Sequence, residues 1–158
     1  MAPPLLAPDD WTEPRAWRIW IGYALVFVIL AIVHAVKGDA DRWGVVARDY
    51  WPATWRWWGA SEDLYTPGIA GFLYLPQSIW LFTPFAYLPF ELDHVLWRVA
   101  GLALLATGLR RAAWSASDTK GGAVFFLATV LVLLCAFSAT NTGQTNLHLA
   151  GLLLQGLG

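Results

Sequence analysis

The stretch GGAVFFLATVLVLLCAFSA, residues Gly121 to Ala139, decides the fold class of this chain because none of its residues is charged. A helix needs about 20 predominantly apolar residues to cross the hydrocarbon core of a bilayer. A second uncharged stretch, IWIGYALVFVILAIVHAV, runs from Ile19 to Val36. A long, acidic segment precedes it and no small-residue cleavage site follows cleanly, so we interpret it as a membrane helix and not as a signal peptide.

The composition of the whole chain agrees with these two stretches. Hydrophobic residues make up 58% of it and charged residues 13%, whereas about a quarter of the residues in a soluble domain are charged. The chain contains 11 tryptophans, and tryptophan favours the interface between membrane and water. Its net charge of -1 gives no electrostatic reason to expect nucleic acid binding. The sequence therefore predicts an all-α, multi-pass transmembrane protein.

We expect one membrane region over residues 1–158, without a soluble domain or an internal repeat. The predicted spans are 19–36, 71–90, 92–109, 121–139 and an incomplete span at 146–158, and an acidic, aromatic loop occupies 37–70. Because the sequence stops inside an apolar helix, we expect the natural protein to be longer. We also expect the 158-residue chain to be inactive alone, because it is too short to enclose two substrates.

The predicted span at 71–90 is unusual because it contains Pro76, Pro84 and Pro89. A proline inside a helix costs about 3 kcal/mol or more. Prolines near the ends of a span cost less than prolines in its middle, so one interpretation is a full crossing. The alternative is a re-entrant segment, since broken helices are tolerated where protein or a cavity satisfies the freed backbone groups.

The charged residues bear on the same choice. Arg15 and Arg18 precede the first span and predict a cytoplasmic N-terminus. A full crossing at 71–90 would place the basic segment 110–120 outside, against the tendency of positive residues to stay in the cytoplasm. Re-entry at 71–90 would remove that conflict.

Four short motifs occur in a fixed order, and the first of them lies near the end of the acidic loop. They are EDLY (Glu62 to Tyr65), FLYLPQSIWLFTPFAYLP (72–89), LWR (Leu96 to Arg98) and TGQTNL (Thr142 to Leu147). This order resembles glycosyltransferase family 87, the polyprenyl-phosphate-mannose-dependent mannosyltransferases of the GT-C superfamily. The resemblance covers roughly Asp39 to the C-terminus. It departs from the family pattern at Leu75, where a proline is common, and in the spacing of the aspartates and aromatic residues before the DLY motif.

The resemblance implies a GT-C-like hexosyltransferase in the plasma (inner) membrane. It also favours a full crossing at 71–90, with the prolines near the two ends of that span. Such an enzyme transfers a sugar, mannose in the family, from a polyprenyl-phosphate donor to an acceptor hydroxyl at the extracytoplasmic face. The expected partners are the lipid bilayer, the lipid-linked sugar and a glycolipid or glycan acceptor. No cofactor is expected, and dependence on a divalent metal stays open, because the two aspartates of GDAD, Gly38 to Asp41, are a weak signal for Mg²⁺ or Mn²⁺.

An inverting transfer needs a carboxylate that takes the proton of the acceptor hydroxyl. The acidic loop offers Asp39, Asp41 and Asp49. The resemblance favours Asp49, which an aromatic residue follows, as the catalytic base, with Asp41 as the second choice. The alternative for each is an ordinary solvated loop charge.

The substrate-binding candidates are Arg48, Tyr65, Tyr74, Gln144 and Asn146. An arginine such as Arg48 can bind the donor phosphate with its forked guanidinium group, or it can extend to lipid headgroups. Amides at the start of an apolar helix cost free energy unless they form hydrogen bonds. Gln144 and Asn146 therefore either cap that helix or hold sugar hydroxyls, and the resemblance favours the second role.

Two other classes of function remain open. A multi-pass transporter or a flippase for lipid-linked sugars would use the same apolar spans, with Gln144, Asn146 or Arg98 in the substrate path. A non-catalytic membrane subunit would need none of these residues. No zinc site is predicted, because the histidines lack the spacing of metal ligands.

Overall fold

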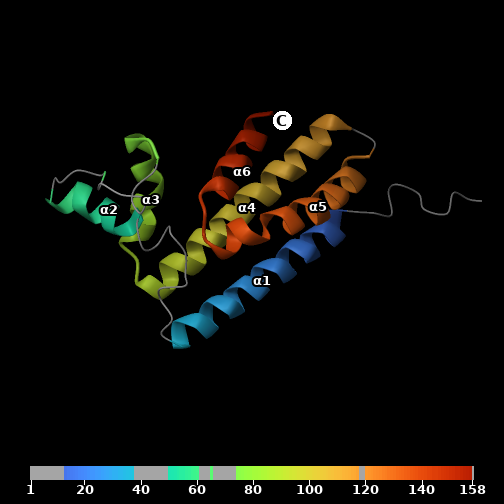
Figure 1. Cartoon of the computed structure of the whole chain (residues 1–158). Coiled ribbons are helices and arrows are strands. Elements are labelled where there is room, and N and C mark those ends of the chain that lie inside the picture. Colours follow the sequence, from blue (N-terminus) through green and yellow to red (C-terminus); the bar gives the residue numbers. More distant parts are fainter. Residues whose placement is uncertain (1–12, 38–49, 61–64, 66–73, 118–119, 158) are drawn as a thin grey trace, which may run out of the picture.

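The computed structural model describes residues 13–37, 50–60, 65, 74–117 and 120–157, and every regular element in these ranges is a helix (Figure 1). Three helices are long: α1 (Glu13–Lys37), α4 (Phe90–Ala116) and α5 (Gly121–Asn141). The shorter elements are α2 (Trp51–Trp55), the π-helical turn η4 (Arg56–Ala60), the 3-10 turn η5 (Pro76–Ser78), α3 (Ile79–Ala86) and α6 (Asn146–Leu157).

Three helices in the described ranges are long and apolar enough to cross a membrane, over Glu13–Val33, Leu92–Ala116 and Gly121–Asn141. The predicted all-α membrane fold is therefore confirmed. The second of these helices is longer than the predicted span 92–109, so that Arg110 and Arg111 belong to its last turns and not to a loop. The reason is local, because Ala, Leu and Arg are strong helix formers.

Helices α1 and α5 run in parallel along each other. The Trp20 Nε1 group donates a hydrogen bond of 2.9 Å to Thr129 Oγ1, and the Tyr23 hydroxyl lies 3.4 Å from the Leu133 carbonyl oxygen. Aromatic contacts continue the same register in both directions, between Trp17 and Phe125 and between Phe27 and Phe137. Residue numbers rise together on both helices, which fixes their common direction.

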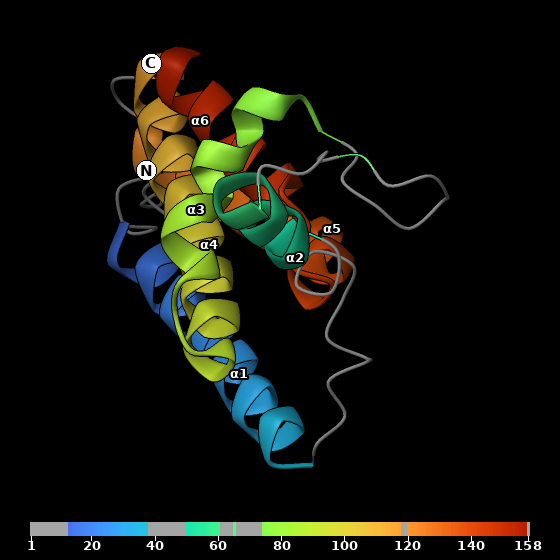
Figure 2. The same ribbon diagram turned by 90° about the vertical axis from the view of Figure 1, so that its left-hand side faces the viewer.

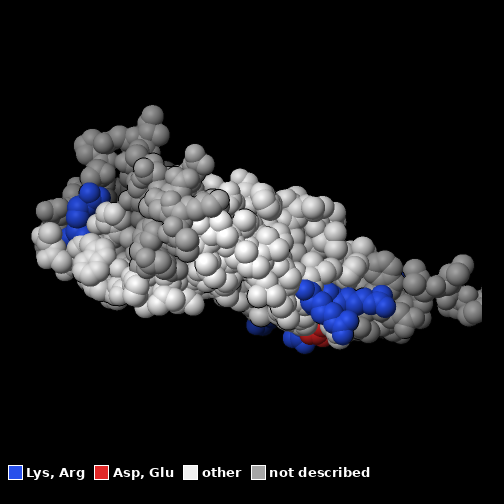
Figure 3. Space-filling model, turned by 90° about the horizontal axis from the view of Figure 1, so that it is seen from below, with Lys and Arg blue, Asp and Glu red and all other residues white. Residues whose placement is uncertain are grey.

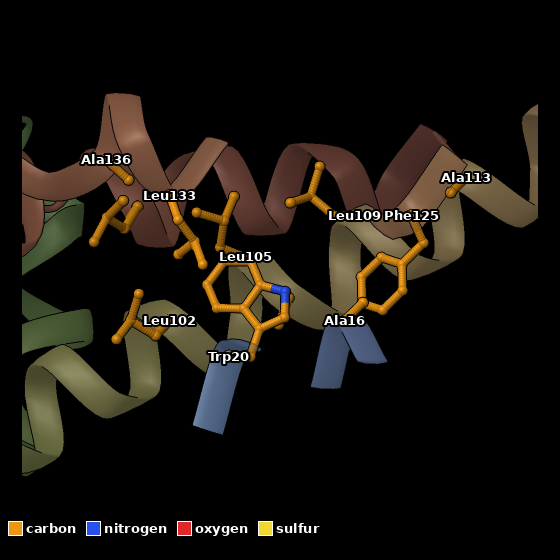
Figure 4. Packing of buried hydrophobic residues seen from close by; sticks show 11 residues of the cluster. Ala16, Trp20, Leu102, Leu105, Leu109, Ala113, Phe125, Leu133 and Ala136 are labelled. Carbon is orange, nitrogen blue, oxygen red and sulfur yellow. The ribbon is translucent and has the colours of Figure 1, made fainter. Parts of the chain in front are cut away.

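The largest apolar core lies between α1, α4 and α5. Figure 4 shows the Trp20 ring of α1 among leucines of α4 and α5, among them Leu105 and Leu133, both of which are buried. Ala16 and Phe125 are fully buried in the same cluster. Full burial of one large apolar side chain contributes about 1.5–3 kcal/mol to stability when the side chain would otherwise be exposed to water. In a bilayer, close packing between helices supplies much of the stabilisation instead.

Helix α4 runs antiparallel to α1, since Glu13 at the start of α1 pairs with Arg110 near the end of α4. It is therefore also antiparallel to α5, which is parallel to α1. We call the end where α1 begins and α4 finishes the basic end, because it carries Arg15, Arg18, Arg110, Arg111 and Lys120. The opposite end, the loop end, holds the last turn of α1, α2, α3, the start of α4 and the turn 142–145 (Figure 1). Figure 3 shows most of the blue Lys and Arg atoms toward one end of the molecule and a smaller blue patch at the other end, with mostly uncharged surface between them.

The segment predicted to cross at 71–90 differs from that prediction in its described part, 74–90. Its α-helix, α3, has 8 residues and therefore rises about 12 Å, far less than the roughly 30 Å of a hydrocarbon core. The prolines explain the breaks: Leu75 is extended before Pro76, and Pro89 disfavours helical backbone at Leu88. Because α1 ends and α4 begins at the same end of the bundle, this part of the chain fits the alternative of a return to the same face.

Helix α6 packs along α4 through glycines. A Cβ atom added to Gly151 would lie 2.6 Å from the Leu104 carbonyl carbon, and one added to Gly108 would lie 2.7 Å from the Gly151 carbonyl oxygen. No real Cβ tolerates such distances. Small residues at a helix crossing let two backbones approach closely, which is a common way to associate helices in a membrane.

Candidate functional site

The indole ring of Trp97 is the centre of an aromatic cluster at the loop end. Trp97 is fully buried on α4. It stacks on Phe82 of α3 at 4.9 Å between ring centroids and on His148 of α6 at 3.8 Å. Trp51 of α2 meets its edge at 6.2 Å. Trp97 thus joins four helices, and Figure 2 shows α2 and α3 side by side next to α4.

Trp97 and Arg98 also hold the turn between α5 and α6. The Trp97 Nε1 group donates to the Gly143 carbonyl oxygen at 2.8 Å. The Arg98 guanidinium donates to the carbonyl oxygens of Thr140 at 3.0 Å and Asn141 at 2.9 Å. Hydrogen bonds from charged donors are worth about 1.5–3 kcal/mol each, so these two adjacent side chains fix the turn firmly.

The turn itself requires a glycine. Gly143 has a φ of 67°, a left-handed conformation that costs an L-residue with a side chain roughly 1–2 kcal/mol. A Cβ atom at this position would also lie 3.4 Å from the Arg98 guanidinium carbon. The conformation reverses the chain after α5 and lets α6 start beside α4.

Three buried polar side chains adjoin the aromatic cluster, where the His94 ring lies 5.7 Å from the Trp51 ring between centroids. Asp93, His94 and Arg98 are each no more than 4% exposed. The Arg98 NH1 group donates to the His94 carbonyl oxygen at 3.2 Å and lies 3.3 Å from His94 Nδ1. His94 Nδ1 in turn lies 3.9 Å from an Asp93 carboxylate oxygen. The Asp93 carboxylate supplies a counter-charge for Arg98, which a buried guanidinium in a membrane helix needs.

His148 is buried against a glycine of α4. A Cβ atom on Gly101 would lie 2.7 Å from His148 Cε1, so the imidazole ring occupies the space that the missing side chain leaves. Both ring nitrogens are buried and have no hydrogen-bond partner among the described residues. The ring therefore contributes mainly by stacking on Trp97.

The predicted substrate-binding tyrosines lie together. Tyr65 is 45% exposed, and its hydroxyl donates to the Tyr74 carbonyl oxygen at 2.9 Å. Tyr74 is half-buried and meets Tyr50 edge-on at 5.3 Å and Phe82 at 6.1 Å between centroids. Through Phe82, this pair adjoins the cluster around Trp97.

The predicted amides lie on the turn that Arg98 and Trp97 hold. Gln144 and Asn146 are both exposed, and the Asn146 amide donates to the Gln144 side-chain oxygen at 3.2 Å. The structure therefore presents two linked amides on the surface of the loop end. Their remaining donors and acceptors are available to sugar hydroxyls.

The remaining predicted site residues, Asp41, Arg48 and Asp49, lie outside the described residues. The neighbour of Asp49 in the sequence, Tyr50, is described: it is 4% exposed and packs on Phe82 at 5.3 Å. The described residues contain no group of three or more His, Cys, Asp or Glu that could hold a metal ion.

Sequence reasoning missed the part that Trp97 and Arg98 play together. The signal was present, because an arginine inside an apolar run is costly unless it is paired or hydrogen-bonded. What the sequence did not reveal is the partner, since the carbonyl groups of Thr140 and Asn141 lie more than 40 positions away.

Comparison with known proteins gives one match. The family model of glycosyltransferase family 87 matches residues 72–157, more than half of the chain. The matched region contains α3 to α6 with Trp97, Arg98, Gln144 and Asn146, and it begins after the acidic loop. No curated protein and no solved structure matches the chain.

Proposed function

Because the chain belongs to glycosyltransferase family 87, we propose that it forms the membrane and acceptor-facing part of an inverting hexosyltransferase of GT-C architecture. The donor is a polyprenyl-phosphate sugar, with mannose as the sugar that the family resemblance implies, and the acceptor is a hydroxyl group of a glycolipid or glycan. The site lies at the loop end, on the extracytoplasmic face of the plasma membrane. Residues 1–158 act as one membrane region.

The distribution of charge between the two ends is the observation that carries this proposal. The basic end carries five basic residues, namely Arg15, Arg18, Arg110, Arg111 and Lys120. Four other Lys and Arg residues, Lys37, Arg42, Arg48 and Arg56, belong to the acidic segment 37–70, where five Asp and Glu residues offset their charge, and Arg98 is buried in α4. Lys and Arg are retained on the cytoplasmic side of membrane proteins. The candidate site and the acidic segment that precedes it then face outward, where a lipid-linked sugar is used.

Exposed aromatic residues support a membrane surface at the loop end. Trp55, Trp58, Trp80 and Tyr87 are between 38% and 66% exposed. Their polar atoms are anchored in part: Trp55 Nε1 donates to the Ala86 carbonyl oxygen, and Trp58 Nε1 donates to Thr83 Oγ1. Aromatic rings at the headgroup level hold short helices such as α2 and α3 in the interface, where a lipid donor and a polar acceptor can meet.

The proposed reaction needs one base and several positioning groups. Asp49, or Asp41 in its place, takes the proton of the acceptor hydroxyl as its oxygen forms a bond to the anomeric carbon. The bond from that carbon to the phosphate oxygen breaks, and polyprenyl phosphate leaves with the electron pair. Arg48 pairs with the phosphate through its guanidinium group.

The described residues position the sugar in this proposal. Gln144 and Asn146 donate and accept hydrogen bonds to its hydroxyls, and Tyr65 and Tyr74 line the side toward α2. Trp97 and Arg98 hold the amide-bearing turn in place and do not touch the substrate. A turn fixed by four helices keeps its amides oriented before the substrate arrives, which is the geometry that productive binding needs.

The proposed catalytic base is tested with conservative amide variants. Asp49→Asn and Asp41→Asn are compared with Asp39→Asn, which makes the same change of charge in the same loop. Transfer of radiolabelled mannose from polyprenyl-phosphate mannose is measured in membrane vesicles. Loss of the base should lower turnover by about 10²–10⁴-fold while the amount of inserted protein stays unchanged. Full activity in all three variants would refute an enzyme with its base in this loop and favour a transporter or an accessory subunit.

The orientation is tested separately with single cysteines. Ala60 follows α2 at the loop end, and Ala116 ends α4 at the basic end. Each is replaced by cysteine in a Cys135→Ala background, and intact cells are treated with a membrane-impermeant thiol reagent. We expect labelling at position 60 and none at 116 until the cells are permeabilised. The reverse pattern would place the candidate site in the cytoplasm and contradict the proposed donor.

A further inference from the structure

A polar cavity, open to the surface, lies at the basic end, far along α4 from the candidate site. It has a volume of about 600 Å³ and is lined by Thr107, Arg110, Arg111, Trp114, Ser115 and Gln155. The first four of these residues recur at helical spacing and therefore share one face of α4, while Gln155 comes from α6. The cavity thus combines two guanidinium groups, an indole ring and neutral polar groups.

The cavity keeps positive charge for a ligand. Arg110 pairs with the Glu13 carboxylate, which also accepts a hydrogen bond from Trp17 Nε1 at 3.2 Å. Arg111 is exposed and forms no hydrogen bond or ion pair with any residue in the described ranges. One cation of the cavity is therefore balanced and the other is available.

The walls of the cavity are held by contacts of their own. Gln155 Nε2 donates to Thr107 Oγ1 at 2.7 Å, and the Thr107 hydroxyl donates to the Ala103 carbonyl oxygen at 2.8 Å. The Trp114 ring lies over Gly121 so closely that an added Cβ would be 2.4 Å from Trp114 Cε3. The indole wall is thus locked between α4 and the start of α5.

An apolar groove lies about one helical turn closer to the middle of the spanning helices. A smaller cavity of about 140 Å³ between α1 and α4 is lined only by apolar side chains: Trp17, Trp20, Ile21, Ala24, Val99, Leu102, Ala103 and Ala106. Ala103 lies four positions before Thr107 on α4, so the groove, which faces α1, adjoins the basic cavity, which faces α6, along that helix. The polar cavity stands toward the end of the spanning helices, and the groove stands toward their middle.

We infer that the basic cavity binds the phosphate headgroup of an anionic glycerophospholipid and that the groove takes part of one acyl chain. Guanidinium groups bind phosphate oxygens in a forked geometry, and basic pockets between membrane helices on the cytoplasmic side suit anionic headgroups. A free phosphate ion shares the headgroup chemistry, but it would have no use for the groove. The lipid would pack α1 and α6 against α4 from the basic end.

The charge requirement is tested by binding of dioleoyl phosphatidylglycerol to the purified, delipidated chain in detergent, measured by native mass spectrometry. Arg111→Gln is compared with Arg18→Gln, which removes an exposed arginine at the same end but outside the cavity. We expect Arg111→Gln to weaken binding about fivefold or more and Arg18→Gln to change it less than about twofold. Equal losses in both variants would overturn the site and leave only non-specific attraction.

The chain requirement separates the lipid from free phosphate. Ala103→Leu fills the groove without touching the charges of the cavity. It should weaken binding of phosphatidylglycerol and leave the weak binding of inorganic phosphate unchanged. If inorganic phosphate bound as tightly as the lipid, or if Ala103→Leu left lipid binding intact, the lipid assignment would be wrong. Far-ultraviolet circular dichroism of all variants confirms that the helices are retained.

Discussion

The close crossing of α4 and α6 makes Gly151→Ala the most decisive substitution for the fold. The new methyl group would lie 2.6 Å from the Leu104 carbonyl carbon, 2.7 Å from the Leu105 nitrogen and 2.8 Å from the Leu104 carbonyl oxygen. All three are backbone atoms of a continuous helix, so no side-chain rotation relieves the contacts. Ordinary contact begins at 3.4 Å, and the two helices must therefore separate by about 0.8 Å.

The expected cost follows from this displacement. Overpacking of a tightly packed interface costs about 1–3 kcal/mol. Apart from any clash, alanine in place of glycine stabilises a helix by about 1 kcal/mol, which hides part of the steric cost. The steric cost is therefore measured as the difference from a control substitution of glycine by alanine that causes no clash. Gly22→Ala supplies this control, because Gly22 lies inside α1 and an added Cβ there meets nothing within 4 Å.

Thermal unfolding of the two variants in detergent micelles, followed by far-ultraviolet circular dichroism, measures the difference. Gly151→Ala should unfold roughly 2–12 °C below Gly22→Ala, and wild-type protein should lie between them. Gly151→Ala with the same midpoint as Gly22→Ala would refute the reasoning, because α6 would then not pack on α4 at this distance.

Three further predictions concern the site and the core, each measured by the same unfolding assay. Arg98→Leu should lower the free energy of unfolding by about 3–5 kcal/mol, because it removes a buried charge beside Asp93 and the donors to the turn carbonyls. A loss below about 1 kcal/mol would contradict the assigned hydrogen bonds. Gly143→Ala should cost about 1–2 kcal/mol because of the φ of 67° at this position. It should also raise the KM for the acceptor, and an unchanged KM would show that this turn does not belong to the proposed site. Thr129→Val should lower the free energy of unfolding by about 1–3 kcal/mol, because the buried Trp20 Nε1 group loses its acceptor. Thr129→Ser keeps the hydroxyl and should retain most of the wild-type stability. Equal losses in the two variants would exclude this hydrogen bond.

The sequence predicted the helical membrane fold because the signals are local. A run without charge, such as residues 121–139, has few alternatives to a membrane helix. The order of short motifs also identified the family, which the match over residues 72–157 confirms.

Only the tertiary structure decided which ends of the helices come together. The pairing of Glu13 with Arg110 and of Trp20 with Thr129 sets the directions of α1, α4 and α5, and these directions place the described part of the proline-bearing segment at one face. Arg98 was visible as a charge in an apolar run, but its carbonyl partners on the turn after α5 were not. The physical reason is that hydropathy and proline act on neighbouring residues, whereas helix direction and buried hydrogen bonds depend on groups that are distant along the chain.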